Sequence, residues 1–301
     1  MNVKVRRRMI NTTPFYLLVL PAFILLAIWF YYPVINSMRM AFYDWDGFLS
    51  ANYVGWSNFK TIFADKYFWM SVRNMAFFLL FGFTFPFLMP FLTAELICSL
   101  RCKGVRTFYR LVFLLPSVVP AVVSILLWRF IYDNSGPLNR ILTGLGLDFA
   151  AHNWLVDPRV ALLAVMFVGF PFAGGTAMLI YTAGLENIPS EIYDSAKMDG
   201  VNTWRRILHI DIPFSVPSFR YIIITGLTGI FANFVVVLLL TNGGPLFRTT
   251  VPGFYLYDKA FGVIPQFGMA CAVGLLLILF SLALAALTQR YLKSDTEYYA
   301  E

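Results

Sequence analysis

A polar segment interrupts the second half of this chain, where residues 187–213 read NIPSEIYDSAKMDGVNTWRRILHIDIP. On either side of it lie stretches without Asp, Glu, Lys or Arg, at residues 160–185 and 221–247. Each stretch is long enough to cross a bilayer, which takes about 20 apolar residues in a helix. We therefore interpret residues 186–213, called the inner element below, as an exposed connection between two membrane-spanning helices.

The same contrast between apolar and charged sequence runs along the whole chain. Charged residues make up 13% of the sequence and the mean hydropathy is +0.70, whereas soluble domains carry about 25% charged residues. A soluble protein with buried helices is disfavoured, because almost no amphipathic sequence is left to cover its core. Asp, Glu, Lys and Arg are absent from residues 9–38, 74–94, 111–128, 160–185, 221–247 and 260–289. We predict an all-α polytopic membrane protein with six transmembrane helices at about 14–35, 72–95, 109–131, 159–184, 217–240 and 267–289.

The distribution of Lys and Arg predicts which side of the membrane each connection faces. These residues number 14 in the 76 residues of 1–13, 95–110, 186–220 and 290–301, and 9 in the 98 residues of 33–73, 129–159 and 241–266. We therefore expect both termini in the cytoplasm, as a segment at 1–13 and a tail at 291–301 that flank one transmembrane domain at 14–290. This orientation accounts for the net charge of +7, which gives no indication of a nucleic-acid partner.

The longest connection on the outer side, residues 37–72, is rich in Trp and Tyr, which favour the membrane–water interface. We predict a short connector and an interfacial helix here, with a turn at residues 44–47, where the sequence is Asp-Trp-Asp-Gly. No connection is long enough to form a soluble domain with its own core.

The first half of the inner element carries strong helix-start signals. Ser190 follows Pro189 and can cap a helix. Glu191 and Asp194 then fall in the first turn, near the positive end of the helix dipole. We expect this helix to end at Asp199-Gly200, because glycine readily adopts the backbone conformation that terminates helices.

A second helix is expected to follow, capped by Asn202 or Thr203 and running to Pro213. Ser195 and Ala196 are small, so a partner's surface can come close to this side of the element. On these grounds alone two interpretations stay open. The element is either an amphipathic segment that lies on the membrane without a partner, or a docking site for a soluble protein.

The spacing of the inner element resembles the EAA signature of permeases that import solutes together with ATP-binding cassette (ABC) proteins. That signature reads E-A-A, three residues, G, nine residues, I, one residue, L-P, and its counterparts here are Asp194-Ser195-Ala196, Gly200, Ile210 and Ile212-Pro213. Asp replaces Glu, Ser replaces the first Ala and Ile replaces Leu, while the spacing is unchanged. The resemblance implies the type I ABC importer permease fold. It also implies an ATPase-coupling role for Glu191, Asp194, Ser195, Ala196, Asp199, Gly200, Ile210 and Pro213.

Other segments look like the carbohydrate-uptake branch of that family, namely residues 52–59 (NYVGWSNF), 114–116 (LLP) and 240–245 (LTNGGP). The resemblance covers nearly the whole chain and implies a permease for a sugar or oligosaccharide. Its implied partners are a second related permease, two subunits that bind ATP and Mg and hydrolyse the ATP, and an extracytoplasmic solute-binding protein. The chain itself would then be no enzyme, would hold no cofactor, and would lie among lipids in the bacterial plasma (inner) membrane.

A candidate substrate path lies in the fifth predicted span. Polar groups inside the membrane are costly and commonly functional, and Asn233 lies near the middle of this span. It can hydrogen-bond a sugar, although a hydrogen bond to another helix is an equally good explanation. The resemblance to maltose-type permeases implies sugar-contacting positions at Gly226, Gly229, Ile230 and Asn233. Only Asn233 keeps a polar side chain, so we expect a sugar other than maltose. Phe172 in the fourth span is a weaker candidate.

Other functions compete with transport of a sugar. An intramembrane enzyme would need a nucleophile with a base, or metal ligands, at one depth, and the spans offer neither. Cys98 and Cys102 could bind a metal only with two further ligands, and His152 and His209 fall in other segments. No catalytic, cofactor or metal site is therefore predicted. A permease for another small polar solute, such as a sugar phosphate, and a membrane sensor whose inner element docks a signalling protein stay open as alternatives.

Overall fold

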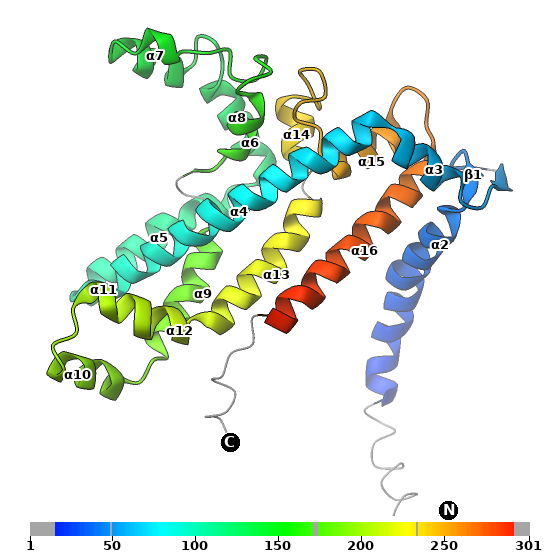
Figure 1. Ribbon diagram of the computed structural model, residues 1–301. Helices are drawn as coiled ribbons and strands as arrows, with labels where there is room; N and C mark the ends of the chain where they lie inside the picture. Colours follow the sequence, from blue (N-terminus) through cyan, green and yellow to red (C-terminus); the bar gives the residue numbers. More distant parts are fainter. Residues whose placement is uncertain (1–15, 49, 171–173, 233, 292–301) are drawn as a thin grey trace, which may run out of the picture. The chain divides into compact units, whose positions relative to one another are not determined.

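The structure is a computed structural model that describes residues 16–48, 50–170, 174–232 and 234–291. The chain divides into two compact units, Met1–Ala64 with Asp258–Leu276 and Asp65–Tyr257 with Leu277–Glu301. Among the described residues almost all secondary structure is helical, as the composition predicts, and a single two-stranded sheet lies in the first unit (Figure 1).

The first unit begins with a helix of 25 residues, Tyr16–Met40. Its middle, η1 (Ala27–Tyr31), is wound as a π-helix, and its last part is α2 (Tyr32–Met40). The strands β1 (Tyr43–Trp45) and β2 (Ala51–Tyr53) then form an antiparallel hairpin, which is followed by α3 (Ser57–Ala64).

This hairpin differs from the predicted turn at residues 44–47, because the first half of that range belongs to a strand. The turn itself begins at Asp46, whose carboxylate accepts a hydrogen bond from the Ser50 hydroxyl at 2.7 Å. The aromatic residues that favoured an interfacial location also pair across the strands, with the Tyr43 and Tyr53 rings 5.4 Å apart. Cross-strand aromatic pairs stabilise such hairpins.

The second unit is built around α4 (Lys66–Ser99), which contains the second predicted span and contacts α9 (Gly175–Glu186) and α13 (Val216–Ala232) (Figure 1). The helix α16 (Phe267–Tyr291) starts in the first unit and ends in the second. Close packing and hydrogen bonds hold helices together in a membrane, because lipid tails are as apolar as the side chains.

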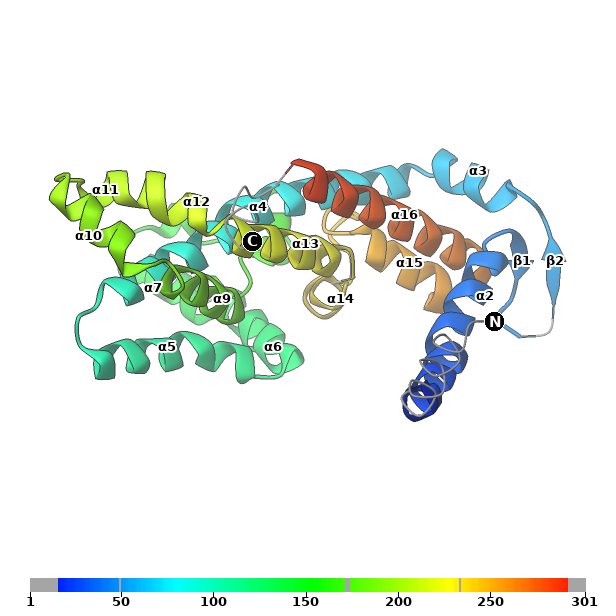
Figure 2. The same ribbon diagram turned by 90° about the horizontal axis from the view of Figure 1, so that it is seen from below.

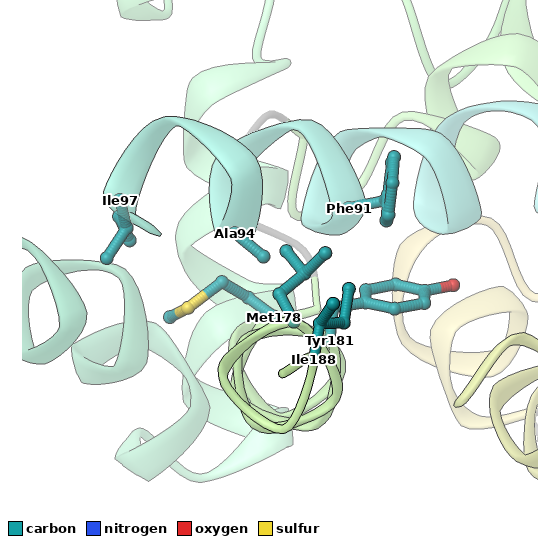
Figure 3. Close-up of a cluster of buried hydrophobic side chains, with 7 residues drawn as sticks. Phe91, Ala94, Ile97, Met178, Tyr181 and Ile188 are labelled. Atoms are coloured by element: carbon teal, nitrogen blue, oxygen red, sulfur yellow. The ribbon is translucent and has the colours of Figure 1, made fainter. Parts of the chain in front are cut away.

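Apolar side chains fill the contact between α4 and α9. Phe91, Ala94 and Ile97 project from α4 toward α9, which Figure 3 shows end-on with Met178 and Tyr181. Tyr181 is fully buried, and its ring meets the Phe91 ring edge-on at 5.5 Å between centroids. This buried cluster, called the inner core below, includes Ile188 of the inner element, and other side chains of that element pack against it.

The third predicted span, 109–131, contains a sharp bend. The helices α5 (Lys103–Val118) and α6 (Ala121–Ile131) meet at 91°. Figure 2 shows the two helices running in different directions. Between them Val119 is extended, with φ −71° and ψ 131°. Proline disfavours the helical conformation in the residue before it and donates no backbone hydrogen bond, so Pro120 explains the break.

The fourth and fifth predicted spans also hold more than one helix each. Residues 159–184 contain α8 (Ala161–Met166) and most of α9, and residues 217–240 contain most of α13 and α14 (Val235–Leu240). Among the described residues, two helices are long and apolar enough to cross a membrane, or up to four if each bent helix pair is one span. The count of six spans and the cytoplasmic orientation of the termini stay predictions.

Apart from the inner element, the remaining elements of the second unit are further connections between these helices. They comprise α7 (Pro137–Gly144), η2 (Asp148–Ala150) and the first part of α15 (Pro252–Phe261). A loop at residues 241–250 is tied to α4 by Asn74, whose buried amide donates to the carbonyl oxygens of Thr250 at 2.9 Å and Phe247 at 3.4 Å. The N-terminal part of α4 therefore holds this loop in place.

Candidate functional site

The inner element forms two short helical segments, and the first of them is α10 (Ser190–Met198). Its N-cap is Pro189, and no side chain caps it, so the predicted capping by Ser190 is wrong. Pro189 has the non-helical backbone that an N-cap needs, which moves Ser190 into the first helical position. Glu191 lies in the first turn as predicted. Asp194 lies beyond it and pairs with Lys197 at 2.9 Å.

The predicted break at Asp199-Gly200 is confirmed. The Gly200 N–H donates to the Lys197 carbonyl at 3.1 Å, and the Val201 N–H donates to the Ala196 carbonyl at 3.0 Å. This is the double hydrogen bond of a Schellman motif, whose residue after the helix is left-handed and most often glycine. Gly200 has φ +70°, and a Cβ added there would have no atom of this chain within 4 Å. The backbone conformation, and no intramolecular contact, accounts for the glycine.

The second segment begins at α11 (Thr203–Arg206), and Asn202 is its cap, as one of the two predicted alternatives. The Asn202 side chain accepts the Arg205 N–H at 2.8 Å. The chain then widens into the π-helix η3 (Ile207–Asp211) and continues as α12 (Ile212–Phe214), which contains Pro213. A proline inside a helix removes a backbone hydrogen bond, and the wider turn before it adapts the helix to that loss.

The apolar side of the inner element packs against the inner core. Ile188 is a buried member of that cluster. Ile192 and Tyr193 from α10, and Ile207, Ile210 and Ile212 from the second segment, pack against it. Ala196 is buried as well. Ile210, one of the predicted coupling residues, therefore packs against the inner core, and both Ile210 and Ala196 also line a groove between the two segments.

The other coupling candidates are exposed. They are Glu191, Asp194, Ser195, Asp199, Gly200 and Pro213. A groove of about 790 Å³ lies between α10 and the second segment. Glu191 and Asp199 line it from α10, and Arg205 and His209 line it from the second segment. The groove therefore presents both acidic and basic groups to a partner.

A buried ionic network ties the two segments to each other and to α4. The Arg206 guanidinium donates from Nε to Asp211 Oδ2 at 2.9 Å and from Nη2 to Glu95 Oε2 at 3.0 Å. The Tyr193 hydroxyl donates to Asp211 Oδ1 at 2.9 Å. The side chains of Asp211 and Glu95 are only 1% and 7% exposed. These four residues, called the polar joint below, therefore connect α10, α11, η3 and α4.

The protonation states of the polar joint follow from its surroundings. Burial, together with the hydrogen bond to Asp211, raises the pKa of the Tyr193 hydroxyl, so that it stays a neutral donor. Burial alone would lower the pKa of Arg206, but the Asp211 and Glu95 carboxylates raise it above its ordinary value. The arginine therefore stays charged and donates to both acidic side chains.

The polar joint was not predicted from the sequence. One signal was present, because Glu95 is the only acidic residue in the basic segment 95–110. A second pairing in this region involves Arg106, whose Nη1 lies 3.2 Å from Glu186 Oε1. Arg110 pairs with the same carboxylate. Arg106 also donates to the Cys98 carbonyl near the end of α4 at 2.8 Å. Some of the basic residues that predict the membrane orientation therefore also connect the ends of neighbouring helices.

The candidate substrate path is only partly within the described residues. Gly226, Gly229 and Ile230 lie on α13, and a Cβ added at either glycine would have no atom within 4 Å. Asn233 and Phe172 lie outside the described residues. In the part of the chain that the structure describes, no group of three His, Cys, Asp or Glu is arranged to hold a metal ion.

Comparison with known proteins gives consistent matches. Residues 88–293 match the family described as binding-protein-dependent transport system inner membrane component. The diacetylchitobiose uptake system permease protein NgcF of Streptomyces coelicolor is 34% identical, over 81% of this chain and 72% of that protein. The lactose transport system permease protein LacF of Rhizobium radiobacter is 28% identical, over 90% and 91% of the two chains. A chain in the crystal structure of a bacterial ABC transporter involved in alginate import superposes with a TM-score of 0.84 at 23% identity, covering 97% of this chain and 99% of that chain.

Proposed function

We propose that this chain is the permease subunit of an ABC importer for a sugar or oligosaccharide. The chain belongs to the family of inner-membrane components of binding-protein-dependent transport systems. A solute-binding protein outside the membrane delivers the sugar. Two partner subunits bind and hydrolyse ATP, and a second related permease completes the path. The observation that carries the proposal is the exposed turn at Gly200 on an element that is anchored from behind by the inner core.

The inner element has the properties of a docking site for the ATP-hydrolysing subunits. One apolar side is occupied by α4 and α9, so the exposed side, which also presents the apolar side chains of Met198, Trp204 and Leu208, is available to a partner. Glu191, Asp199 and Arg205 line the groove on that side, and Asp194 is exposed as well. The left-handed turn at Gly200 has free space around it, and a partner's surface can approach its backbone closely.

The relatives support a saccharide as the transported solute. The names of NgcF and LacF refer to diacetylchitobiose and lactose, and both proteins match most of this chain. We assign the substrate path to Gly226, Gly229, Ile230 and Asn233 of the fifth span, with Phe172 from the fourth. The open space around the two glycines is compatible with a path. A sugar phosphate as the solute, and a sensor without transport, are the alternatives.

The test substitutes Gly200 in the complete complex, reconstituted in proteoliposomes with its binding protein. Asn tolerates the left-handed conformation better than other side chains, so Gly200→Asn leaves the isolated chain folded and adds bulk only toward a partner. We expect both sugar uptake and the ATP hydrolysis stimulated by the loaded binding protein to fall at least tenfold. The matched control is Gly146→Asn, because Gly146 also has a positive φ, +74°, and no atom within 4 Å of an added Cβ, but lies in an outer connection.

Each result distinguishes between the candidate functions. Normal sugar uptake by the Gly200→Asn complex would show that the ATP-hydrolysing subunits do not dock at the inner element. In the unsubstituted complex, ATP hydrolysis that responds to the binding protein without any accumulation of sugar would favour the sensor. Uptake of a sugar phosphate in preference to the free sugar would favour the other permease alternative.

A further inference from the structure

The polar joint links elements that the chain itself does not connect closely. Arg206 and Glu95 are 111 residues apart, and Tyr193 and Asp211 are 18 apart. The sequence of contacts runs from α10 through Tyr193 to Asp211, then through Arg206 to Glu95 on α4. Arg206 therefore links the inner element to α4, the longest helix of the second unit.

We propose that the polar joint makes the inner element and α4 move as one body, and that Arg206 is the positioning residue that transmits movement between them. This inference rests on the proposed function, in which the inner element receives the movement of the ATP-hydrolysing subunits. Apolar contacts between these parts are non-directional. Hydrogen bonds from a planar guanidinium to two carboxylates fix both direction and distance.

A cavity beside the polar joint explains why such a fixed link is needed. It has a volume of about 530 Å³, and Glu95, Tyr193 and Arg206 line it together with residues of α10 and the ends of α4 and α9. The inner element is therefore not packed against the membrane helices on this side. Without the polar joint, a push on the element would be absorbed by its tilting into the cavity.

Other ion pairs of this region do not replace the polar joint. Lys197 and Asp194 lie within α10 and are about three-quarters exposed, at 76% and 70%, and such pairs contribute little. Arg106 and Arg110 hold α5 to Glu186 at the end of α9, so they do not reach the second segment of the inner element. Among the described residues, the ion pair between the inner element and α4 is the one made by Arg206.

The helix that receives the movement reaches the outer side. Glu95 and Asn74 are separated by roughly 31 Å along α4, at about 1.5 Å per residue, which is the thickness of the apolar part of a bilayer. Asn74 holds the carbonyl groups of Thr250 and Phe247 in the outer loop. A displacement of the inner element is therefore passed along α4 to the loop at residues 241–250.

The test replaces the whole network by neutral side chains. Loss of one member of a buried ion pair is strongly destabilising, whereas neutral replacement of all charged members is often tolerated. We therefore compare Arg206→Met with the triple variant Glu95→Gln/Arg206→Met/Asp211→Asn in the reconstituted complex. We expect the triple variant to assemble and to keep its basal ATP hydrolysis within about twofold, while its stimulation by the sugar-loaded binding protein falls at least tenfold. A triple variant with full stimulation and full uptake would overturn the inference.

A second measurement applies if the triple variant does not assemble. Cysteines are placed at Glu95 and Arg206 in a chain whose Cys98, Cys102 and Cys271 are Ser, and a bifunctional thiol reagent bridges them. We expect stimulation to return to within about threefold of the cysteine-free parent after bridging, because the link stays closed throughout the cycle. If the bridged complex is stimulated no more than the unbridged one, the proposed role of the polar joint is refuted.

The exposed Arg101 serves as the control, because Arg101→Met removes an inner positive charge outside the network, and its stimulation should equal that of the parent. A parent complex that shows no stimulation at all would count against the proposed function and leave the joint without a role. If the sugar-loaded binding protein stimulates ATP hydrolysis equally in the parent and in the triple variant, the proposed role of the polar joint is rejected and the proposed function is kept.

Discussion

Substitution of Gly175 by Ala tests the packing that positions the inner core. Gly175 is the first residue of α9 and is buried. A Cβ added there would lie 2.6 Å from the Phe113 carbonyl oxygen and 3.2 Å from the Leu114 Cα, both in the backbone of α5. Small residues allow membrane helices to approach this closely. Backbone atoms cannot rotate away, so the two helices must separate to admit the methyl group.

The magnitude follows from the extent of that overlap. Insertion of one carbon into a tightly packed contact costs about 1–3 kcal/mol. A cost near 2 kcal/mol lowers the melting temperature by roughly 4–8 °C for a domain of 150–250 residues. We expect a fall in this range when thermal unfolding of the purified protein in detergent is followed by intrinsic fluorescence.

The matched control is Gly104→Ala on α5, where an added Cβ would have no atom within 4 Å. Alanine has the higher helix propensity, by about 1 kcal/mol at most, so this variant should melt at or slightly above the temperature of the parent. If Gly175→Ala melts together with the parent and with Gly104→Ala, then α5 and α9 do not meet backbone to backbone. The inner core would then be positioned by something other than this close helix contact, and the reasoning from Gly175 would be refuted.

Three further predictions concern topology, the substrate path and the polar joint. In a chain without its native cysteines, Ser50→Cys should react with an impermeant thiol reagent from outside and Lys103→Cys should not, and the reverse pattern would contradict the predicted orientation. Asn233→Leu should lower sugar uptake at least fivefold while ATP hydrolysis still responds to the loaded binding protein, because loss of a buried hydrogen bond costs about 1–3 kcal/mol; an equal loss of both activities would indicate a structural role. Burial raises the pKa of Tyr193 in the folded protein, so its contribution to stability persists below the ordinary tyrosine pKa of about 10 and is lost as the pH rises beyond it. Tyr193→Phe, which leaves Asp211 with one donor fewer, should be less stable at neutral pH but should lose less stability above about pH 10 in chemical unfolding.

Local features of the inner element could be predicted from the sequence because they depend on few neighbours. The turn at Gly200 follows from one glycine after a helical pattern, and Asn202 caps the next helix through the backbone three residues later. The choice of Pro189 over Ser190 as the first cap was missed, since both residues suit a helix start. When two neighbouring residues both favour a helix start, the sequence does not determine at which of them the helix begins.

Features that depend on distant segments could not be predicted. Nothing in the spacing pairs Arg206 with Glu95, because a charge has many possible partners and only the folded arrangement, which brings Arg206 to within 3.0 Å of Glu95, selects one. The bend after Val118 has a local cause in Pro120, but proline is tolerated within many membrane helices. Its effect on the direction of the third predicted span therefore depends on how neighbouring helices satisfy the freed backbone groups.

The basic residues of the inner side carry two kinds of information that the sequence does not separate. Arg101 and Lys103 are exposed, and they contribute to orientation through their charge. Arg106 and Arg110 count equally in the charge sum, yet both pair with Glu186 and bind α5 to α9. Loss of a paired arginine removes a packing contact in addition to a charge, whereas loss of an exposed one changes the charge distribution alone. Variants of these four positions with equal effects on topology should therefore differ in stability, and that difference separates the two roles.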